Sequence, residues 1–313
     1  MEIVINLSAN ISHEVISHYG GITVTPQQIV EGGRHHDTRE ITSLDLVDEW
    51  VRASPEHPQI IGTSAKEFIH SFVEIIKRDR DILVITTSRK VIQTFQAALA
   101  ATRTLASMPA CSDVRVRVVD SGGTDVLTGL LTILAAEGRK AGLSLDQVGD
   151  LLETAAQVST FTFTVDTLTH LTKGGRAPTL KTWMAGILGI RPLLVFREGE
   201  VAIAGKVQHK KENAVVRLAD LVGQGHEGAG PVWLGVSHGN DDGRGRRLVE
   251  ALKSRFNAEF VYFRPFCSSV YLNVGPAAIS AAVLPLAKLG PWRPPPPLNF
   301  RASDLSSAPP PVH

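Results

Sequence analysis

The sequence predicts an α/β protein of two domains, with a mainly parallel sheet in the N-terminal domain and a mixed sheet with helices in the second. The chain has 313 residues and is 43% hydrophobic, which is enough for two cores. β-rich runs alternate with amphipathic helical runs, as in a parallel sheet covered by helices. In the second half, residues 197–200 alone separate two β-rich runs, so a hairpin adds antiparallel strands.

The predicted elements follow one another in a clear order. Strands are predicted at 2–7, 59–64, 81–87, 114–120, 160–166, 191–196, 200–208, 231–237 and 258–264. Helices are predicted at 65–78, 91–106, 142–158 and 245–256, the third of which opens with Ser144 and Gln147 at capping-box spacing. We place the domain boundary after this helix, so that 1–160 and 161–289 are the two domains. Residues 290–313 are rich in proline and serine and are predicted to be a flexible tail.

Composition argues against several classes of protein. The chain has 32 Lys+Arg and 31 Asp+Glu residues, so it lacks the excess of positive charge that would attract nucleic acid. Two cysteines and an N-terminus without a basic or apolar signal region predict a cytoplasmic protein, and no apolar run reaches the roughly 18 residues of a membrane span. The only tight cluster of metal-ligand types is His35, His36 and Asp37, which is more typical of a solvated loop, so no metal site and no cofactor are predicted.

Two strand-end loops carry hydroxyl groups that suit a carboxylate or phosphate. Thr63 and Ser64 follow one strand, and 86–88, with the sequence TTS, follow another. Ser64 and Glu67 have capping-box spacing, which favours helix capping as the role of Ser64, so Thr63 is the better ligand candidate. The loop 118–124, VVDSGGT, lacks the spacing of a nucleotide-binding motif.

The segment GVSHG, residues 235–239, matches the nucleophile elbow of serine hydrolases, with Ser237 as the nucleophile. After His238, the only histidine that follows is His313, and the residues after the motif resemble a loop rather than a helix. A serine hydrolase is therefore a minor alternative.

Residues 170–201 combine a cationic corner with apolar surface. Gly174 and Gly175 permit a tight turn that presents Lys173 and Arg176. The apolar positions that follow include Trp183, Met184, Ile187, Leu188, Ile190 and Leu193. They form either an ordinary core helix or the wall of a tunnel for a long apolar ligand.

This block, from LTHLTKGGRAP to HKKENAV (168–215), closely resembles the GGR block of the DegV family of bacterial fatty-acid-binding proteins. Five further stretches resemble family motifs: INLSANISHE at 5–14, GTSAKEF at 62–68, VITTSRKVIQTFQAA at 84–98, VRVVDSGG at 116–123 and VYLNVGPAAIS at 270–280. The resemblance covers residues 3 to about 286. It implies a two-domain DegV-like fold that holds a fatty acid between its domains.

The resemblance also implies site residues and a role. The head group would be held by Thr63, Ser64, Gln93, Thr94 and Asn273, and the apolar positions at 183–193 would line the acyl tunnel. Lys173, Gly174, Gly175 and Arg176 would lie near the head group or form the corner that docks a partner. The protein would be a lipid carrier rather than an enzyme, and some relatives present the acid to a separate fatty acid kinase.

The chain departs from the family pattern at the head group. Ile92 and Gln93 replace a serine and a glycine, Asn273 replaces a histidine, and Asn6 and Asn10 replace aspartates. Half of the usual carboxylate cradle is absent, so amide hydrogen bonds from Gln93 and Asn273 are expected instead. The ligand is then an unusually held fatty acid or a neutral or amide-bearing lipid, and a degenerate regulatory module without lipid is the alternative.

Overall fold

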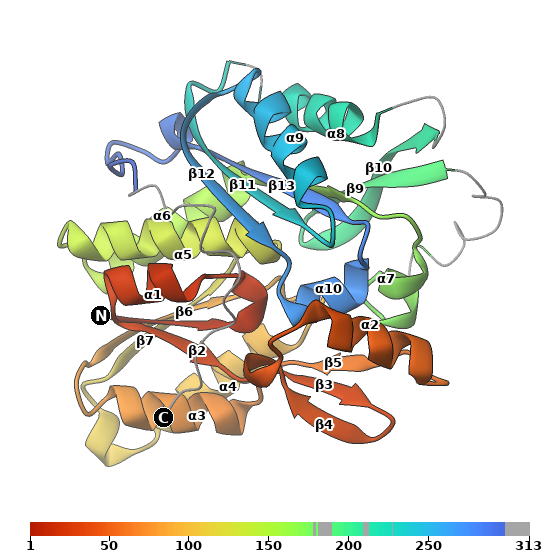
Figure 1. Cartoon of the computed structure of the whole chain (residues 1–313). Coiled ribbons are helices and arrows are strands. Elements are labelled where there is room, and N and C mark those ends of the chain that lie inside the picture. The colour runs from red at the N-terminus through yellow and green to blue at the C-terminus, as the bar shows by residue number, and fades with distance from the viewer. Residues whose placement is uncertain (178–179, 181–189, 209–212, 227, 298–313) are drawn as a thin grey trace.

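The computed structural model describes residues 1–177, 180, 190–208, 213–226 and 228–297. The described helices and sheets stack in layers: helices, sheet, helices, sheet, helices (Figure 1). This arrangement agrees with the predicted alternation of strands and helices.

The first sheet, sheet A, is wholly parallel and has the order β2-β1-β6-β7. Its strands are β1 (Glu2–Asn6), β2 (Ile22–Thr25), β6 (Asp81–Thr86) and β7 (Arg115–Asp120). Side chains alternate between its faces, so Val4 packs against α3 (Ala65–Ile75) and α4 (Thr94–Ala106), whereas Ile3 and Ile5 face α5 (Asp125–Lys140) and α6 (Leu145–Val158).

The second sheet, sheet C, is mixed, with the order β10-β9-β8-β13-β11-β12. Its strands are β8 (Thr160–Thr164), β9 (Ile190–Arg197), β10 (Glu200–Gln208), β11 (Pro231–His238), β12 (Asn257–Pro265) and β13 (Ile279–Pro285). Among its described strand pairs, only β11 and β12 are parallel. Helices α8 (Ala214–Gln224) and α9 (Asp242–Lys253) cover its outer face. Helix α5 lies between the two sheets, which explains why 14 of its 16 residues are buried.

The predicted hairpin is present between β9 and β10. Arg197 pairs with Glu200, and the two residues between them, Glu198 and Gly199, have φ of 50° and 81°. Positive φ at both central positions is the mark of a type I′ turn, whose twist matches that of the flanking strands.

A small antiparallel sheet, sheet B, projects from the first domain in the order β4-β3-β5. It consists of β3 (Gln28–Glu31), β4 (Arg34–Asp37) and β5 (Gln59–Ile61). His35 and His36, predicted in a solvated loop, lie in strand β4, where the ring of His36 stacks on Trp50. Strand β5 therefore does not end at the carboxyl edge of the parallel sheet, which was the setting predicted for Thr63.

The remaining α-helices of the described chain are α1 (His13–Tyr19), α2 (Leu44–Ala53), α7 (Thr169–Lys173) and α10 (Ser268–Val274). Helix α10 packs against both α2 and α7. None of the helices in the described part of the chain is long and apolar enough to cross a membrane.

The predicted tail begins with a segment that packs on the body of the protein. Trp292 lies against the core, Pro294 and Pro297 are buried, and Arg293 pairs with Glu259 at 2.5 Å. Residues 298–313 lie outside the described residues.

Candidate functional site

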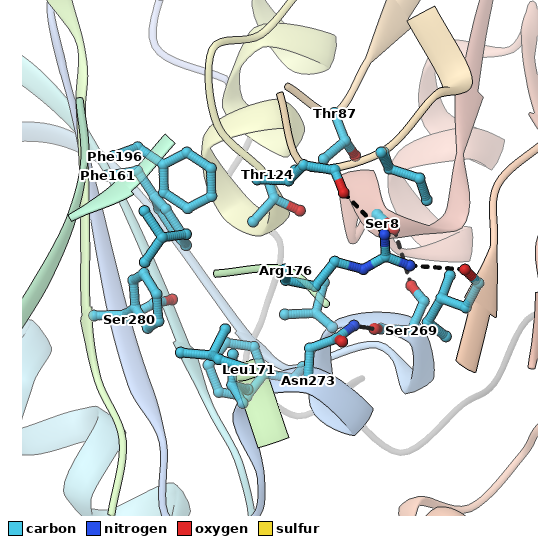
Figure 2. Close-up of a pocket in the computed structure, with 18 residues that line it drawn as sticks. Ser8, Thr87, Thr124, Phe161, Leu171, Arg176, Phe196, Ser269, Asn273 and Ser280 are labelled. Atoms are coloured by element: carbon cyan, nitrogen blue, oxygen red, sulfur yellow. Dashed lines mark hydrogen bonds between the residues drawn. The ribbon is translucent and has the colours of Figure 1, made fainter. Parts of the chain in front are cut away.

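A cavity lies between sheet C and the carboxyl edge of sheet A, and α10 forms part of its wall (Figure 2). Apolar side chains predominate among its 18 lining residues: Ile60, Val91, Ile92, Phe161, Phe163, Leu171, Phe196, Val201, Phe266, Val270 and Val274. The polar members are Ser8, Thr87, Thr124, Arg176, Ser269, Asn273 and Ser280. An apolar cavity with a few placed polar groups is the usual form of a site for a small ligand.

The topology of sheet A places two of these polar residues. After β1 the chain continues to β2 on one side of it in the sheet, and after β6 it continues to β7 on the opposite side. A crevice is therefore expected beyond the carboxyl ends of β1 and β6, which lie next to each other. Ser8 follows β1 and Thr87 follows β6, and both line the cavity. The Oγ1 atom of Thr87 is buried and has no hydrogen-bond partner among the described residues. A buried hydroxyl without a partner indicates that a ligand or water atom belongs beside it.

Arg176 is the one charged residue among the described residues that line the cavity. Its Nη1 donates to the carbonyl oxygen of Val91 at 2.9 Å, and its Nη2 donates to that of Ile60 at 2.7 Å. Burial lowers the pKa of the guanidinium group, and no acidic side chain of the described residues offsets this. A partly buried cation without a counter-ion among the described residues favours an anionic or strongly polar ligand atom.

Three phenylalanine rings form the side of the cavity that sheet C provides. The ring centroids of Phe161 and Phe196 are 5.6 Å apart, and those of Phe163 and Phe196 are 6.3 Å apart. In Figure 2, Phe161 and Phe196 lie across the cavity from Ser8 and Ser269. We call the side with the rings, where Ser280 also lies, the apolar side, and the side with Ser8, Ser269 and the end of the Arg176 side chain the polar side.

Four of the five residues predicted to bind a head group do not line this cavity. Thr63 donates its hydroxyl hydrogen to the carbonyl oxygen of Pro26 at 2.7 Å and lies 2.9 Å from the hydroxyl oxygen of Thr25. Ser64 caps α3 in a capping box with Glu67, which was the alternative prediction for it.

Gln93 and Thr94 begin α4, where the side chain of Gln93 is exposed. The side chain of Thr94 is buried, and its hydroxyl has no hydrogen-bond partner in the described part of the chain. The hydroxyl of Thr94 and the side chain of Ile92 both lie against Gly62, 2.5 and 3.0 Å from where a Cβ atom there would lie.

Asn273 and the predicted glycine corner do meet at the cavity. Asn273 lines it and donates one amide hydrogen to the carbonyl oxygen of Ser269 at 2.9 Å. Gly174 has no room for a side chain, because a Cβ atom there would lie 2.3 Å from Oδ1 of Asn273, and Gly175 has a φ of 72°. Lys173 is exposed, and its carbonyl oxygen accepts a hydrogen bond from Gln59.

The predicted tunnel wall is only partly described. Trp183, Met184, Ile187 and Leu188 lie outside the described residues. Ile190 and Leu193 belong to β9 rather than to a helix, and neither lines the cavity. Leu193 packs on the outer face of sheet C with α8 and α9, because neighbouring residues of a strand point to opposite faces. Leu193 therefore lies on the face of sheet C away from this cavity.

Ser237 does not have the geometry of a hydrolase nucleophile. It is completely buried within β11, and its Oγ lies 3.3 Å from Nδ2 of Asn10, next to the carboxyl group of Asp125. The ring of His238 stacks on Phe263. A nucleophile elbow requires an exposed serine at a strand-to-helix turn, and this serine is neither exposed nor at a turn.

A second, outer depression adjoins the cavity and shares with it Ile60, Val91, Ile92 and Arg176. Its other lining residues are Ile61, Gly62, Thr63, Ser64, Arg89, Lys90, Gln93, Gln96 and Ala97. Three of the predicted head-group residues thus lie in this outer groove instead of the cavity. Arg176 is the cationic side chain common to both among the described residues.

The sequence patterns did not single out Ser8, Thr124 or Ser269. Ser8 and Ser269 are 261 residues apart, and nothing in local spacing links them. Thr87 lies in a hydroxyl-rich loop that the sequence did indicate, although Thr63 was the preferred ligand.

Comparison with known proteins identifies the family. The family model described as "Uncharacterised protein, DegV family" matches residues 1–286. The chain belongs to the DegV family. A DegV domain-containing protein of Deinococcus radiodurans is 30% identical over 271 residues, which is 85% of this chain and 92% of that one.

Solved DegV structures share the fold. A DegV family protein of Thermus thermophilus, described by its fatty acid binding, superposes with a TM-score of 0.81 at 21% identity, over 91% of this chain and 99% of that one. A DegV family protein of Ruminococcus gnavus with vaccenic acid gives 0.81 at 18% identity, over 90% of this chain and 98% of that one. The predicted two-domain DegV-like α/β fold is confirmed.

Proposed function

We propose that this DegV protein binds a long-chain fatty acid or a related acyl lipid in the cavity, with the head group at Arg176 and the acyl chain against the phenylalanine rings. The observation that carries the proposal is a partly buried guanidinium group, without a carboxylate partner among the described residues, in the wall of a mainly apolar cavity. The DegV proteins of Thermus thermophilus and Ruminococcus gnavus, described with fatty acids, support the same class of ligand.

The two sides of the cavity are expected to contribute differently to the free energy of binding. Each buried methylene group contributes about 0.8 kcal/mol, so a long acyl chain supplies most of the affinity. A hydrogen bond to a charged group contributes about 1.5 to 3 kcal/mol, which fixes orientation and selects the head group. Arg176 is held by the carbonyl groups of Val91 and Ile60, so the guanidinium is already positioned before the ligand arrives.

We further propose that the protein carries the lipid rather than converting it, and presents the head group to a partner such as a fatty acid kinase. The outer groove supports this proposal because Arg176 lines both the groove and the cavity. A partner that covers the groove would then reach the head-group end of the ligand without entering the apolar side.

The proposal is tested by titrating a fluorescent long-chain fatty acid into delipidated protein. We expect saturable binding of one ligand per chain, and binding at least tenfold weaker in Arg176→Met. The matched control is Arg255→Met, an arginine paired with Asp220 at the outer layer of sheet C, which should bind as the wild type does. No saturable binding by the wild type would refute the proposal.

A further inference from the structure

The polar side of the cavity contains a chain of hydrogen bonds whose direction can be worked out. The backbone N–H of Ser8 donates to Oε1 of Gln27 at 3.3 Å, and Ser8 Oγ lies 2.9 Å from the same Oε1. Ser8 Oγ also lies 3.0 Å from Ser269 Oγ, and Ser269 Oγ lies 3.4 Å from Sγ of Cys267. Ser8 and Ser269 both line the cavity and are 6% and 2% exposed.

The backbone fixes the direction of the first bond. Because a backbone N–H can only donate, the atom of Gln27 that faces Ser8 must be the carbonyl oxygen and not the amide nitrogen. That oxygen can only accept, so the single hydroxyl hydrogen of Ser8 is used by Gln27.

The remaining bonds follow from this first one. Ser8 Oγ has no hydrogen left for Ser269, so Ser269 donates its own hydrogen to Ser8. The thiol of Cys267 then donates to Ser269, which agrees with burial raising the pKa of that thiol to about 11 and keeping it protonated. Both serines therefore have their hydrogens committed, and each lines the cavity with one lone pair left to accept a hydrogen bond.

The polar side is thus divided into a donor part and an acceptor part. Within the described chain, Arg176 uses two of its five N–H donors on the carbonyl groups of Val91 and Ile60, and the hydroxyl of Thr87 has no partner. Ser8 and Ser269 present acceptors. In the view of Figure 2 the two serines lie on the same side of the cavity as the end of the Arg176 side chain.

A carboxylate alone satisfies only one part of such a site. Its two oxygens accept hydrogen bonds from Arg176 and Thr87, but toward Ser8 and Ser269 it would set lone pairs against lone pairs. To bind there it must either be protonated or break the serine chain. A head group that also bears a hydrogen-bond donor satisfies both parts.

We propose that the preferred ligand of this cavity is an acyl lipid whose head group carries an O–H or N–H donor beside its carbonyl oxygen, the donor being received by Ser8 and Ser269 and the carbonyl oxygen by Arg176. This inference rests on the proposed function and names its substrate class. Two sources share this chemistry: a hydroxy fatty acid, whose hydroxyl is the donor, and a primary fatty acid amide, whose NH₂ group is the donor.

The experiment measures displacement of a fluorescent fatty acid from the delipidated full chain at pH 7.5 by four competitors of equal chain length. These are hexadecanoic acid, its methyl ester, 3-hydroxyhexadecanoic acid and hexadecanamide. We expect the hydroxy acid or the amide to bind at least tenfold more tightly than both hexadecanoic acid and the ester. This factor corresponds to one additional buried hydrogen bond, from the head-group donor to Ser8 or Ser269. Whichever of the two binds more tightly identifies the source of the donor.

The inference is overturned if hexadecanoic acid binds at least as tightly as the hydroxy acid and the amide, because the cavity would then recognise no hydrogen-bond donor in the head group. That result would leave the proposed function intact, whereas failure of all four competitors and of the fluorescent acid would refute both.

Substitutions test which residues accept the hydrogen bond from the head-group donor. Ser269→Ala should reduce the preference for the donor-bearing head group to less than threefold. The matched control is Ser268→Ala, the preceding residue of α10, which is also buried but does not line the cavity and should keep the preference. Gln27→Leu frees the hydrogen of Ser8 and should increase the affinity for hexadecanoic acid relative to the amide. An unchanged preference in folded Ser269→Ala and Gln27→Leu proteins would contradict the assignment.

Discussion

Ser280 Oγ donates a hydrogen bond to Oδ2 of Asp125 at 2.9 Å and so joins β13 of sheet C to the first residue of α5. Asn10 donates to the other oxygen of the same carboxyl group at 2.8 Å. Asn10 and Asp125 both have positive φ, 50° and 56°, which costs free energy at residues other than glycine. The two domains are therefore tied by a buried polar seam beside the cavity.

The seam predicts a pH dependence of stability. Burial raises the pKa of Asp125 above its ordinary value of 3.8, so the folded state binds this proton more tightly than the unfolded chain does. The stabilisation is complete below pH 3.8 and is lost as the pH rises through the folded-state pKa. Asp125→Asn, which keeps the shape and a neutral group, should remove this dependence, whereas Asp125→Ala should destabilise by about 3 kcal/mol.

Chemical denaturation across the pH range measures the difference between wild type and Asp125→Asn. The account of the seam fails if the free energy of unfolding of the wild type does not fall, relative to the variant, as the pH rises above 3.8.

A second pH effect, of opposite sign, is predicted for His57 and His170, whose ring centroids are 5.6 Å apart. Burial, followed by repulsion from His170, lowers the pKa of His57 to about 4. The unfolded chain then binds the proton more tightly, so stability is present above pH 6.5 and is lost as the pH falls toward 4. His57→Gln should flatten the fall in melting temperature over this window; an equal fall in both proteins would exclude His57 as its source.

Two threonines are predicted to differ in what their hydroxyl groups do. Thr63 is hydrogen-bonded to Pro26 and Thr25 away from the cavity, so Thr63→Val should lower stability by about 1 kcal/mol and leave ligand affinity unchanged. Thr87 lines the cavity with its hydroxyl unpaired within the described chain, so Thr87→Val should weaken ligand binding severalfold without loss of stability. Melting curves and displacement titrations of both variants check this, and the reverse pattern would restore Thr63 to the site.

The phenylalanine rings are predicted to limit the acyl chain. Removing the ring in Phe196→Ala opens space for about two or more further methylene groups, each worth about 0.8 kcal/mol, so longer chains should gain roughly tenfold relative to hexadecanoic acid. Phe263→Ala, on the other face of sheet C, is the matched control and should leave the length preference unchanged. Equal preferences in the two variants would show that these rings do not bound the chain.

Sequence patterns predict the elements of this fold where one face is polar or a turn is distinctive. The β9–β10 hairpin was predictable because Glu198 and Gly199 suit a tight turn, and α6 because Ser144 and Gln147 form its capping box. Helix α5 was not predicted, because it is buried between two sheets and lacks the polar face that reveals a helical period.

The candidate site was predicted only in part for a similar reason. The corner at Gly174, Gly175 and Arg176 is contiguous and could be identified from its residues. The polar side of the cavity joins Ser8 to Ser269 across 261 residues, and only the folded chain brings them together. Thr63 is assigned to the head group by its resemblance to the family motif and by the expectation that β5 ends at the carboxyl edge of the parallel sheet, and β5 belongs to sheet B instead.

The most direct test of the central claim is mass spectrometry of organic extracts from the purified protein and from Val270→Trp, which fills the cavity from α10. Circular dichroism and melting curves establish that the variant is folded. The account predicts an acyl lipid near one equivalent per chain in the wild type and little in the variant. Absence of any acyl lipid from the wild type in repeated preparations, or equal amounts in the two proteins, would contradict it.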